Sequence, residues 1–223
     1  MDIILVLIAL AITTLSQFYI TSKYNKYSKV SNSRKINGFE TARKILDKHG
    51  LNNIYITETE GTLTDHYDPT KKVIKLSKNI FNDTAITSCA VAAHEVGHAI
   101  QDKENYSFLK IRNSIVPLVN FSSYSGYIAI MIGLLFSSMT ILWIGIALEI
   151  IVLLFQLITL PVEFNASKRA LEELKKLNLV DANESGYIKE VLTAAALTYV
   201  ASVVSTITQI LRLIITFGNS NRK

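Results

Sequence analysis

The sequence predicts a mainly helical protein that crosses a membrane four times and carries a small α+β module between its apolar segments. Three observations predict this fold class. The apolar residues, 49% of the 223, are gathered in blocks about as long as a bilayer is thick. The polar stretch after the first block shows helical spacing and short strand-like runs. Basic residues are concentrated in the polar segments, as they are in the cytoplasmic parts of membrane proteins.

Four transmembrane helices are expected from the apolar blocks. Residues 3–20 form the first block, residues 118–160 are long enough for two spans, and residues 191–217 give the fourth. No basic residue precedes the first block and no small-residue cleavage site follows it, so we interpret it as an uncleaved anchor. The two spans within residues 118–160 form a hairpin, and the chain therefore returns to the same side of the membrane after Leu160.

The basic residues predict the orientation. Of the 23 Lys and Arg, 15 lie between Lys23 and Arg112 and five lie between Lys168 and Lys189. By the positive-inside rule, both polar segments face the cytoplasm. Topology and attraction to anionic lipid then explain the net charge of +5, and without a basic-aromatic motif we expect no nucleic-acid partner. The single cysteine, Cys89, allows no internal disulfide and fits a reducing compartment.

These expectations divide the chain into five segments. They are an N-terminal anchor at 1–22, a cytoplasmic module at 23–114, a transmembrane hairpin at 115–160, a cytoplasmic helix at 161–190 and a C-terminal transmembrane helix at 191–223.

The cytoplasmic module is expected to contain a helix and a short β-hairpin before its last helix. Residues 38–49 have apolar residues at helical spacing, and Gly50 ends that helix. Residues 53–57 and 72–76 are rich in Ile, Val and Tyr and predict two strands of a hairpin. The edge of such a hairpin can bind an extended peptide as an added strand.

The run His94-Glu95-Val96-Gly97-His98 lies on the last predicted helix of this module. Asn82 or Asp83 can cap that helix, which continues to about Gln101. Two histidines four apart on a helix point the same way and can share one zinc ion, and the glutamate between them can activate the attacking water. The motif therefore predicts a zincin-like module. Because a catalytic zinc site has three protein ligands and one open position, a third ligand is expected outside the motif.

Glu163 is the expected third ligand, because it is the first carboxylate after the hairpin returns the chain to the side of the histidines. Pro161 can start the helix that carries Glu163. Glu104 occupies the position of the third ligand in the metzincin pattern, but Gln101 stands where that pattern requires a turn-forming glycine. Asp102 lies too far along the motif helix to complete a tetrahedral site and is expected to be a solvated helix-end charge.

Two further residues are candidates for a functional role. His66 lies in the expected hairpin, where an isolated histidine usually makes local hydrogen bonds; beside a zinc site it can also polarise the substrate carbonyl or contact the zinc ligands. We therefore keep His66 with Glu95 as a candidate catalytic residue. Glu149 lies within the third span, roughly 20 Å along a helix from Glu163, and is expected to pair with Arg212 inside the bundle.

Several motifs together resemble those of one bacterial family. They are residues 61–69 (GTLTDHYDP), 73–77 (VIKLS), 92–101 (AAHEVGHAIQ), 160–167 (LPVEFNAS) and 194–200 (AAALTYV). The chain resembles the YugP-type putative neutral zinc metallopeptidases along nearly its whole length. The resemblance implies a membrane-bound zinc endopeptidase that is distantly similar to CAAX-prenyl and HtpX-like gluzincins. In those relatives the third ligand is the glutamate of a Glu-x-x-Ala-Asp pattern, which Glu163 and Ala166 match, whereas Ser167 replaces the aspartate.

The residues therefore predict metal-assisted peptide hydrolysis at a membrane, with the active site facing the cytoplasm, and the resemblance implies that this membrane is a bacterial cell membrane. In this mechanism zinc held by His94, His98 and Glu163 polarises a water and the scissile carbonyl, while Glu95 moves the proton of the water to the leaving amine. An intramembrane protease of the site-2 type would need its motif inside a span, together with an aspartate ligand, and neither is visible. A catalytically inactive, zinc-stabilised membrane scaffold is the remaining alternative. The expected substrate is a peptide or a membrane protein, and the sequence predicts no oligomeric state.

Overall fold

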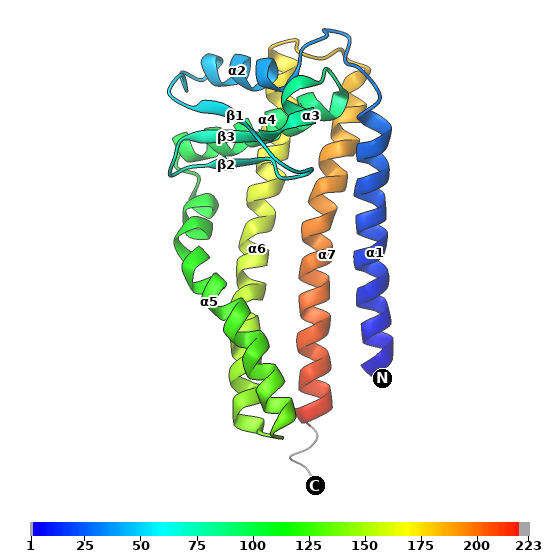
Figure 1. The fold of residues 1–223 in the computed structure, drawn as a ribbon, viewed down its shortest axis with the longest axis vertical. Helices are drawn as coiled ribbons and strands as arrows, with labels where there is room; N and C mark the ends of the chain where they lie inside the picture. The colour runs from blue at the N-terminus through cyan, green and yellow to red at the C-terminus, as the bar shows by residue number, and fades with distance from the viewer. Residues whose placement is uncertain (1, 219–223) are drawn as a thin grey trace. The chain divides into compact units, whose positions relative to one another are not determined.

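The computed structural model describes residues 2–218, which are mainly helical (Figure 1). Four of the described helices are long and apolar enough to cross a membrane, which confirms the four expected candidate spans. They are α1 (Asp2–Tyr27), α5 (Ser107–Leu135), α6 (Met139–Lys176) and α7 (Glu184–Gly218). The expected end segments also include residues 1 and 219–223, which lie outside the described residues.

The chain folds into two compact units, which we call unit 1 and unit 2. Unit 1 contains α1 through Gln17, α5, α6 through Pro161, and α7 from Leu197 onward. Unit 2 contains Phe18–Tyr106 and Val162–Ala196. The five-segment division made from the sequence stays a prediction.

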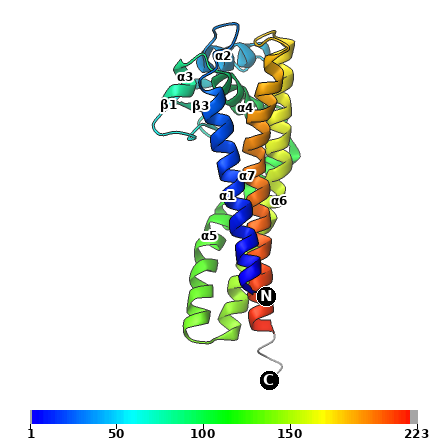
Figure 2. The same cartoon turned by 90° about the vertical axis from the view of Figure 1, so that its right-hand side faces the viewer.

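Unit 1 is a bundle of apolar helices in which α5 and α6 are antiparallel neighbours joined by a short turn (Figure 2). Glycines allow this pair to pack closely, since a Cβ added to Gly145 would lie 2.9 Å from the backbone nitrogen of Ile130. The buried core of unit 1 includes Leu142 and Ile146 of α6 and Ile210 of α7. The apolar block at 118–160 is therefore the expected pair of helices.

The sequence suggested that a helix begins at Pro161, and this expectation was wrong. Pro161 lies inside a continuous helix that runs from Met139 to Lys176. Proline is tolerated inside long apolar helices because neighbouring groups can satisfy the carbonyl that loses its N–H partner. Glu163 is thus carried by the same helix as the third candidate span.

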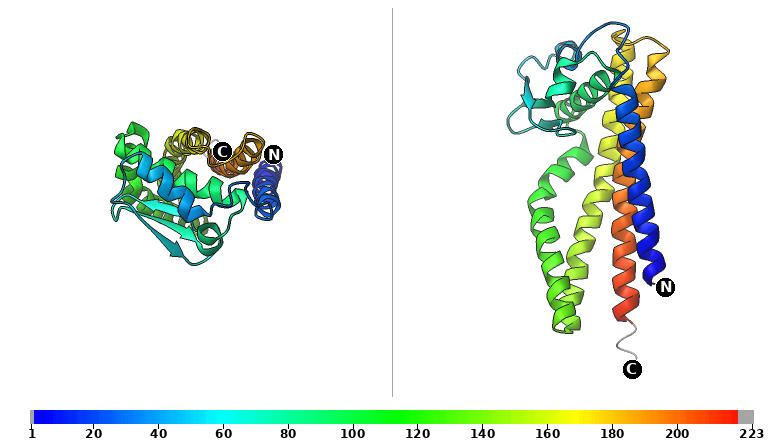
Figure 3. Two further views of the ribbon diagram at one scale, coloured as in Figure 1. Left: turned by 90° about the horizontal axis from the view of Figure 1, so that it is seen from above. Right: turned by 45° about the vertical axis from the view of Figure 1, so that its right-hand side comes forward.

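Unit 2 is built around α4 (Ile86–Lys103), which is buried along nearly its whole length. Against α4 pack α2 (Gly38–Lys48), α3 (Lys78–Asn82) and a three-stranded sheet (Figure 3). Helix α2 begins with a capping box, in which the Asn37 side chain accepts from the backbone N–H of Glu40 and the Glu40 carboxylate accepts from that of Asn37. The apolar face of α2, including Ile45 and Leu46, is fully buried.

Helix α4 starts later than predicted, and neither Asn82 nor Asp83 caps it. Residues 78–82 form the separate helix α3, which Asp83 ends in an extended conformation. The N-cap of α4 is Ala85, whose side chain offers no hydrogen bond. Instead, the backbone carbonyl of Val30 accepts from the Ile86 N–H at 2.8 Å, so the loop before α2 satisfies the start of α4.

The sheet differs from the predicted hairpin. Its order is β1 (Tyr55–Thr59), β3 (Val73–Ser77), β2 (His66–Asp68), with β1 parallel and β2 antiparallel to β3. The predicted hairpin between 53–57 and 72–76 was therefore wrong. The tight turn joins β2 to β3, because the Asp68 carboxylate accepts from the N–H groups of Thr70 and Lys71 at 2.9 and 3.0 Å. This leaves β1 to pair with the other edge of β3.

Candidate metal centre

The candidate site lies where α4 and α6 touch within unit 2. Gly97, in the middle of the motif, makes this approach possible: a Cβ there would lie 2.6 Å from the backbone oxygen of Ala166 on α6. No larger residue fits at this spacing without moving one of the helices. The contact brings Glu163, almost one helical turn before Ala166, to the face of α4 that carries His94 and His98.

Three side chains converge at this contact. His94 Nε2 lies 3.2 Å from Glu163 Oε2, and His98 Nε2 lies 3.6 Å from the same oxygen. One ligand atom from each of these residues lies within 4.8 Å of the other two. Glu163 is only 2% exposed, and such a buried carboxylate needs positive charge or hydrogen-bond donors around it.

The donor set and its spacing fit a zinc ion. Zinc bonds of about 2.0–2.1 Å to nitrogen and oxygen in a tetrahedron give ligand-to-ligand distances of about 3.4 Å. The observed 3.2 and 3.6 Å lie on either side of that value. Two imidazoles and one carboxylate are a donor set that is found in zinc sites with three protein ligands.

Each histidine has a second polar neighbour on its Nδ1 atom. His94 Nδ1 lies 3.2 Å from the Ser167 hydroxyl, and His98 Nδ1 lies 3.0 Å from Gln101 Oε1. Such contacts orient the imidazole rings of metal ligands. Ser167, which stands where the Glu-x-x-Ala-Asp pattern has its aspartate, therefore still contacts His94.

Glu95 lies beside this set and not within it. It is 7% exposed, and burial raises the pKa of its carboxyl to about 7. The neighbouring His94 and a hydrogen bond from the Tyr67 backbone N–H lower the pKa of Glu95 but do not outweigh burial. In the metal-free protein the carboxyl of Glu95 thus keeps its proton to a higher pH than an exposed glutamate does.

The strand β2 carries both His66 and the N–H that reaches Glu95. His66 is exposed, and its Nδ1 lies 2.8 Å from the Thr64 carbonyl oxygen. Because a carbonyl only accepts, Nδ1 must carry the hydrogen, and a neutral His66 then has an acceptor at Nε2. His66 is not part of the three-residue metal group found among the described residues.

The other carboxylates considered from the sequence have different partners. Glu104 forms an ion pair with Arg169 at 2.7 Å and is not part of the metal group among the described residues. Asp102 is not a freely solvated charge, because it accepts from the Tyr67 hydroxyl at 2.8 Å and pairs with Lys72 at 2.6 Å. It thereby ties β2 and the start of β3 to α4.

Glu149 and Arg212 do not form the expected ion pair within the described part of unit 1. The Glu149 carboxylate lies beside α5, 3.6 Å from the position a Cβ on Gly126 would take. Arg212 instead lines a cavity of about 430 Å³ together with residues of α1 and α5, including Thr13 and Tyr127.

Comparison with known proteins agrees with a zinc site. The family model described as putative neutral zinc metallopeptidase matches residues 2–218. A Bacillus subtilis (strain 168) protein described as putative membrane protease YugP is 43% identical over 217 residues, which cover 97% of this chain and 96% of that relative. No solved structure matches the chain.

Proposed function

The chain belongs to the family of putative neutral zinc metallopeptidases, and from that premise we propose that it is a membrane-bound zinc endopeptidase of the gluzincin type. The proposed ligands are His94, His98 and Glu163, and the proposed general base is Glu95. One observation carries the proposal: three zinc-binding side chains from two helices converge beside a buried glutamate that is not one of them. The zincin-like module is then unit 2.

In the proposed mechanism, His94, His98 and Glu163 would hold zinc, which would act as a Lewis acid toward a water and the scissile carbonyl. The Glu95 carboxylate accepts a proton from that water and donates it to the nitrogen of the leaving amine. Its position suits this role, because Glu95 follows His94 and projects about 100° around the helix from it. In the metal-free protein burial raises the pKa of the Glu95 carboxyl, and a raised pKa makes its carboxylate a stronger base.

The position of strand β2 supports the proposal that the substrate is a peptide. The strand forms one edge of the sheet and packs against α4, so a peptide lying along this edge in extended form would pass close to Glu95. His66, on the same strand, is the proposed second catalytic residue. Since its Nδ1–H contacts Thr64, His66 can donate from Nε2 to a carbonyl oxygen only as the imidazolium ion.

We further propose that unit 2 faces the cytoplasm. Of the 23 Lys and Arg, 13 lie in its first segment and five in its second. Cysteines placed at Val30 or Lys175 in a Cys89→Ala background should react with an impermeant thiol reagent only from the cytoplasmic side, and one at Ser138 only from the other side. If the cysteines at 30 and 175 reacted from opposite sides, Glu163 could not belong to the site.

The decisive experiment compares wild type with Glu95→Gln. The substitution keeps the shape of the side chain and removes the base, so bound zinc should stay at the wild-type level while cleavage of a quenched peptide library falls by roughly 10²- to 10⁴-fold. His94→Ala is the matched control and should lose both zinc and cleavage. Zinc binding without any cleavage that depends on Glu95 would instead identify an inactive, zinc-stabilised scaffold.

A further inference from the structure

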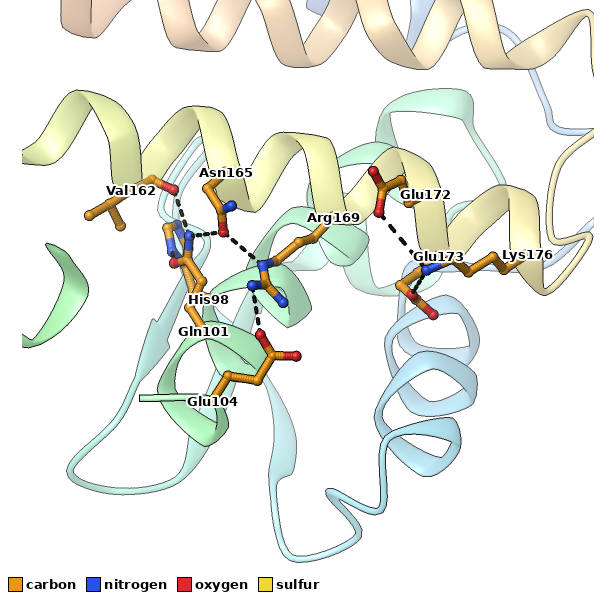
Figure 4. Close-up of polar contacts among 9 residues, drawn as sticks. All are labelled: His98, Gln101, Glu104, Val162, Asn165, Arg169, Glu172, Glu173 and Lys176. Carbon is orange, nitrogen blue, oxygen red and sulfur yellow. Dashed lines mark hydrogen bonds and ion pairs between the residues drawn. The ribbon is translucent and has the colours of Figure 1, made fainter. Parts of the chain in front are cut away.

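Gln101 is a buried polar residue that links the two helices of the metal site (Figure 4). It lies three residues after His98 on α4, on the same face of the helix, and is fully buried. Its Oε1 lies 3.0 Å from His98 Nδ1. Its Nε2 donates to the Val162 backbone oxygen at 2.8 Å and to Asn165 Oδ1 at 2.9 Å.

The neighbours of Gln101 determine which way its amide points. The Val162 carbonyl can only accept, so the Gln101 atom that faces it must be the nitrogen. Asn165 leads independently to the same orientation. The Arg169 Nε–H can only donate, and it lies 2.7 Å from Asn165 Oδ1, so this Asn165 atom must be the amide oxygen. The Gln101 atom that faces the same oxygen must then be the nitrogen. Arg169 is itself held by Glu104 at 2.7 Å. The oxygen of the Gln101 amide must therefore face His98.

This orientation determines the tautomer of His98. An amide oxygen only accepts, so His98 Nδ1 must carry the hydrogen. In the neutral ring the other nitrogen, Nε2, is then unprotonated, and it is the atom that lies 3.6 Å from Glu163 Oε2. The lone pair required of a metal ligand is thus directed to the place where the other two ligand atoms converge.

The same amide also ties the third ligand to the motif helix. Val162 and Asn165 lie on either side of Glu163 on α6, and both accept from Gln101 Nε2. We propose that Gln101 is a positioning residue of the metal site: its oxygen sets the tautomer of His98, and its nitrogen holds the Glu163 segment of α6 against α4. This proposal rests on the metal ligands proposed above.

Nitrogen NMR of protein labelled with ¹⁵N-histidine measures the tautomer directly. The chain has only four histidines, and His98→Asn identifies the His98 signals. In the full-length protein, zinc-loaded or treated with a chelator, His98 Nδ1 should be protonated, and in the zinc-loaded protein Nε2 should be metal-bound. In chelator-treated Gln101→Met the ring loses its acceptor and should change to a mixture of tautomers. Gln101→Glu still offers an oxygen and should keep Nδ1–H.

Zinc affinity, measured by chelator competition, tests the positioning role. Gln101→Met should bind zinc about 10- to 100-fold more weakly than wild type, as is typical when a group that orients a metal ligand is removed. The matched control is Thr41→Val, which removes another fully buried hydrogen-bonding group of unit 2, one bonded to the Asn37 carbonyl. It should destabilise the fold without changing zinc affinity.

Two results would overturn the proposal. One is an unprotonated Nδ1 on His98 in the wild-type protein, which needs no variant to fold. The other is a folded Gln101→Met with the tautomer and zinc affinity of wild type. A wild type with the expected tautomer but no zinc binding would contradict the proposed function instead, so the two failures can be told apart.

Discussion

Gly97→Ala should damage the metal site without changing any ligand. The new Cβ would lie 2.6 Å from the Ala166 backbone oxygen, whereas ordinary contacts of this kind begin at 3.4 Å. Because the obstacle is backbone, it cannot rotate away, and α6 must move back by about the difference, roughly 0.8 Å. Glu163 is on the same stretch of helix and would move with it.

The magnitude follows from two opposing effects. Replacing glycine by alanine inside a helix favours folding by about 0.5–1 kcal/mol, but overpacking of this kind costs about 1–3 kcal/mol. The net effect on the free energy of unfolding is therefore a loss of about 1 kcal/mol. The effect on chemistry should be larger, since a displacement of about 1 Å at a catalytic centre can reduce activity about 100-fold. Zinc affinity should fall as well, because the distances from Glu163 to the two histidines leave the range that zinc requires.

The assay combines thermal unfolding in detergent, zinc affinity by chelator competition, and cleavage of a quenched peptide library. Gly186→Ala is the matched control, because Gly186 lies in the first turn of α7 and a Cβ there meets nothing within 4 Å. It should leave zinc affinity and cleavage unchanged and raise stability slightly. If Gly97→Ala kept the zinc affinity and cleavage rate of wild type, the close approach of α4 and α6 would not be what positions Glu163.

Two other predictions concern the ligands and the base. Purified Glu163→Ala should lose zinc to the same extent as His94→Ala, whereas Glu104→Ala should keep its zinc; the reverse pattern, measured by metal analysis, would make Glu104 the ligand. In metal-free protein, burial raises the pKa of Glu95 from 4.5 to about 7, so the stability contributed by its neutral form is complete below pH 4.5 and is lost as the pH rises through 7. The loss is at most about 3 kcal/mol, and Glu95→Gln should abolish it, so equal pH dependence of unfolding in both chelator-treated proteins would refute the assignment.

The parts of the fold that the sequence predicts are those determined by local composition. The four candidate spans and helix α2 follow from runs and spacings that any neighbouring structure must accommodate. The parallel direction of β1 beside β3 does not, because the third strand, β2, takes the hairpin position next to β3 and leaves β1 the opposite edge. The start of α4 was missed for a similar reason, since a distant carbonyl, that of Val30, performs the role expected of Asp83.

The candidate site shows the same division. The spacing of His94 and His98 is a local signal, and Glu163 could be inferred from the return of the chain across the membrane. The contacts of Gln101 and Ser167 depend on how closely two helices approach, which one sequence does not record. A weak signal did exist: Gln101 lies three residues after His98, and Ser167 lies four after Glu163, so each shares a helix face with a ligand.

The distance along the chain between the motif and Glu163 has a consequence for biosynthesis. The 69 residues that separate His94 from Glu163 include all of α5 and the apolar first part of α6. At about 5–20 residues per second, a ribosome needs about 3–14 s to synthesise that stretch. During this interval the nascent chain has two histidines without their carboxylate partner. The proposed peptidase therefore cannot be active before both of these helices have been made.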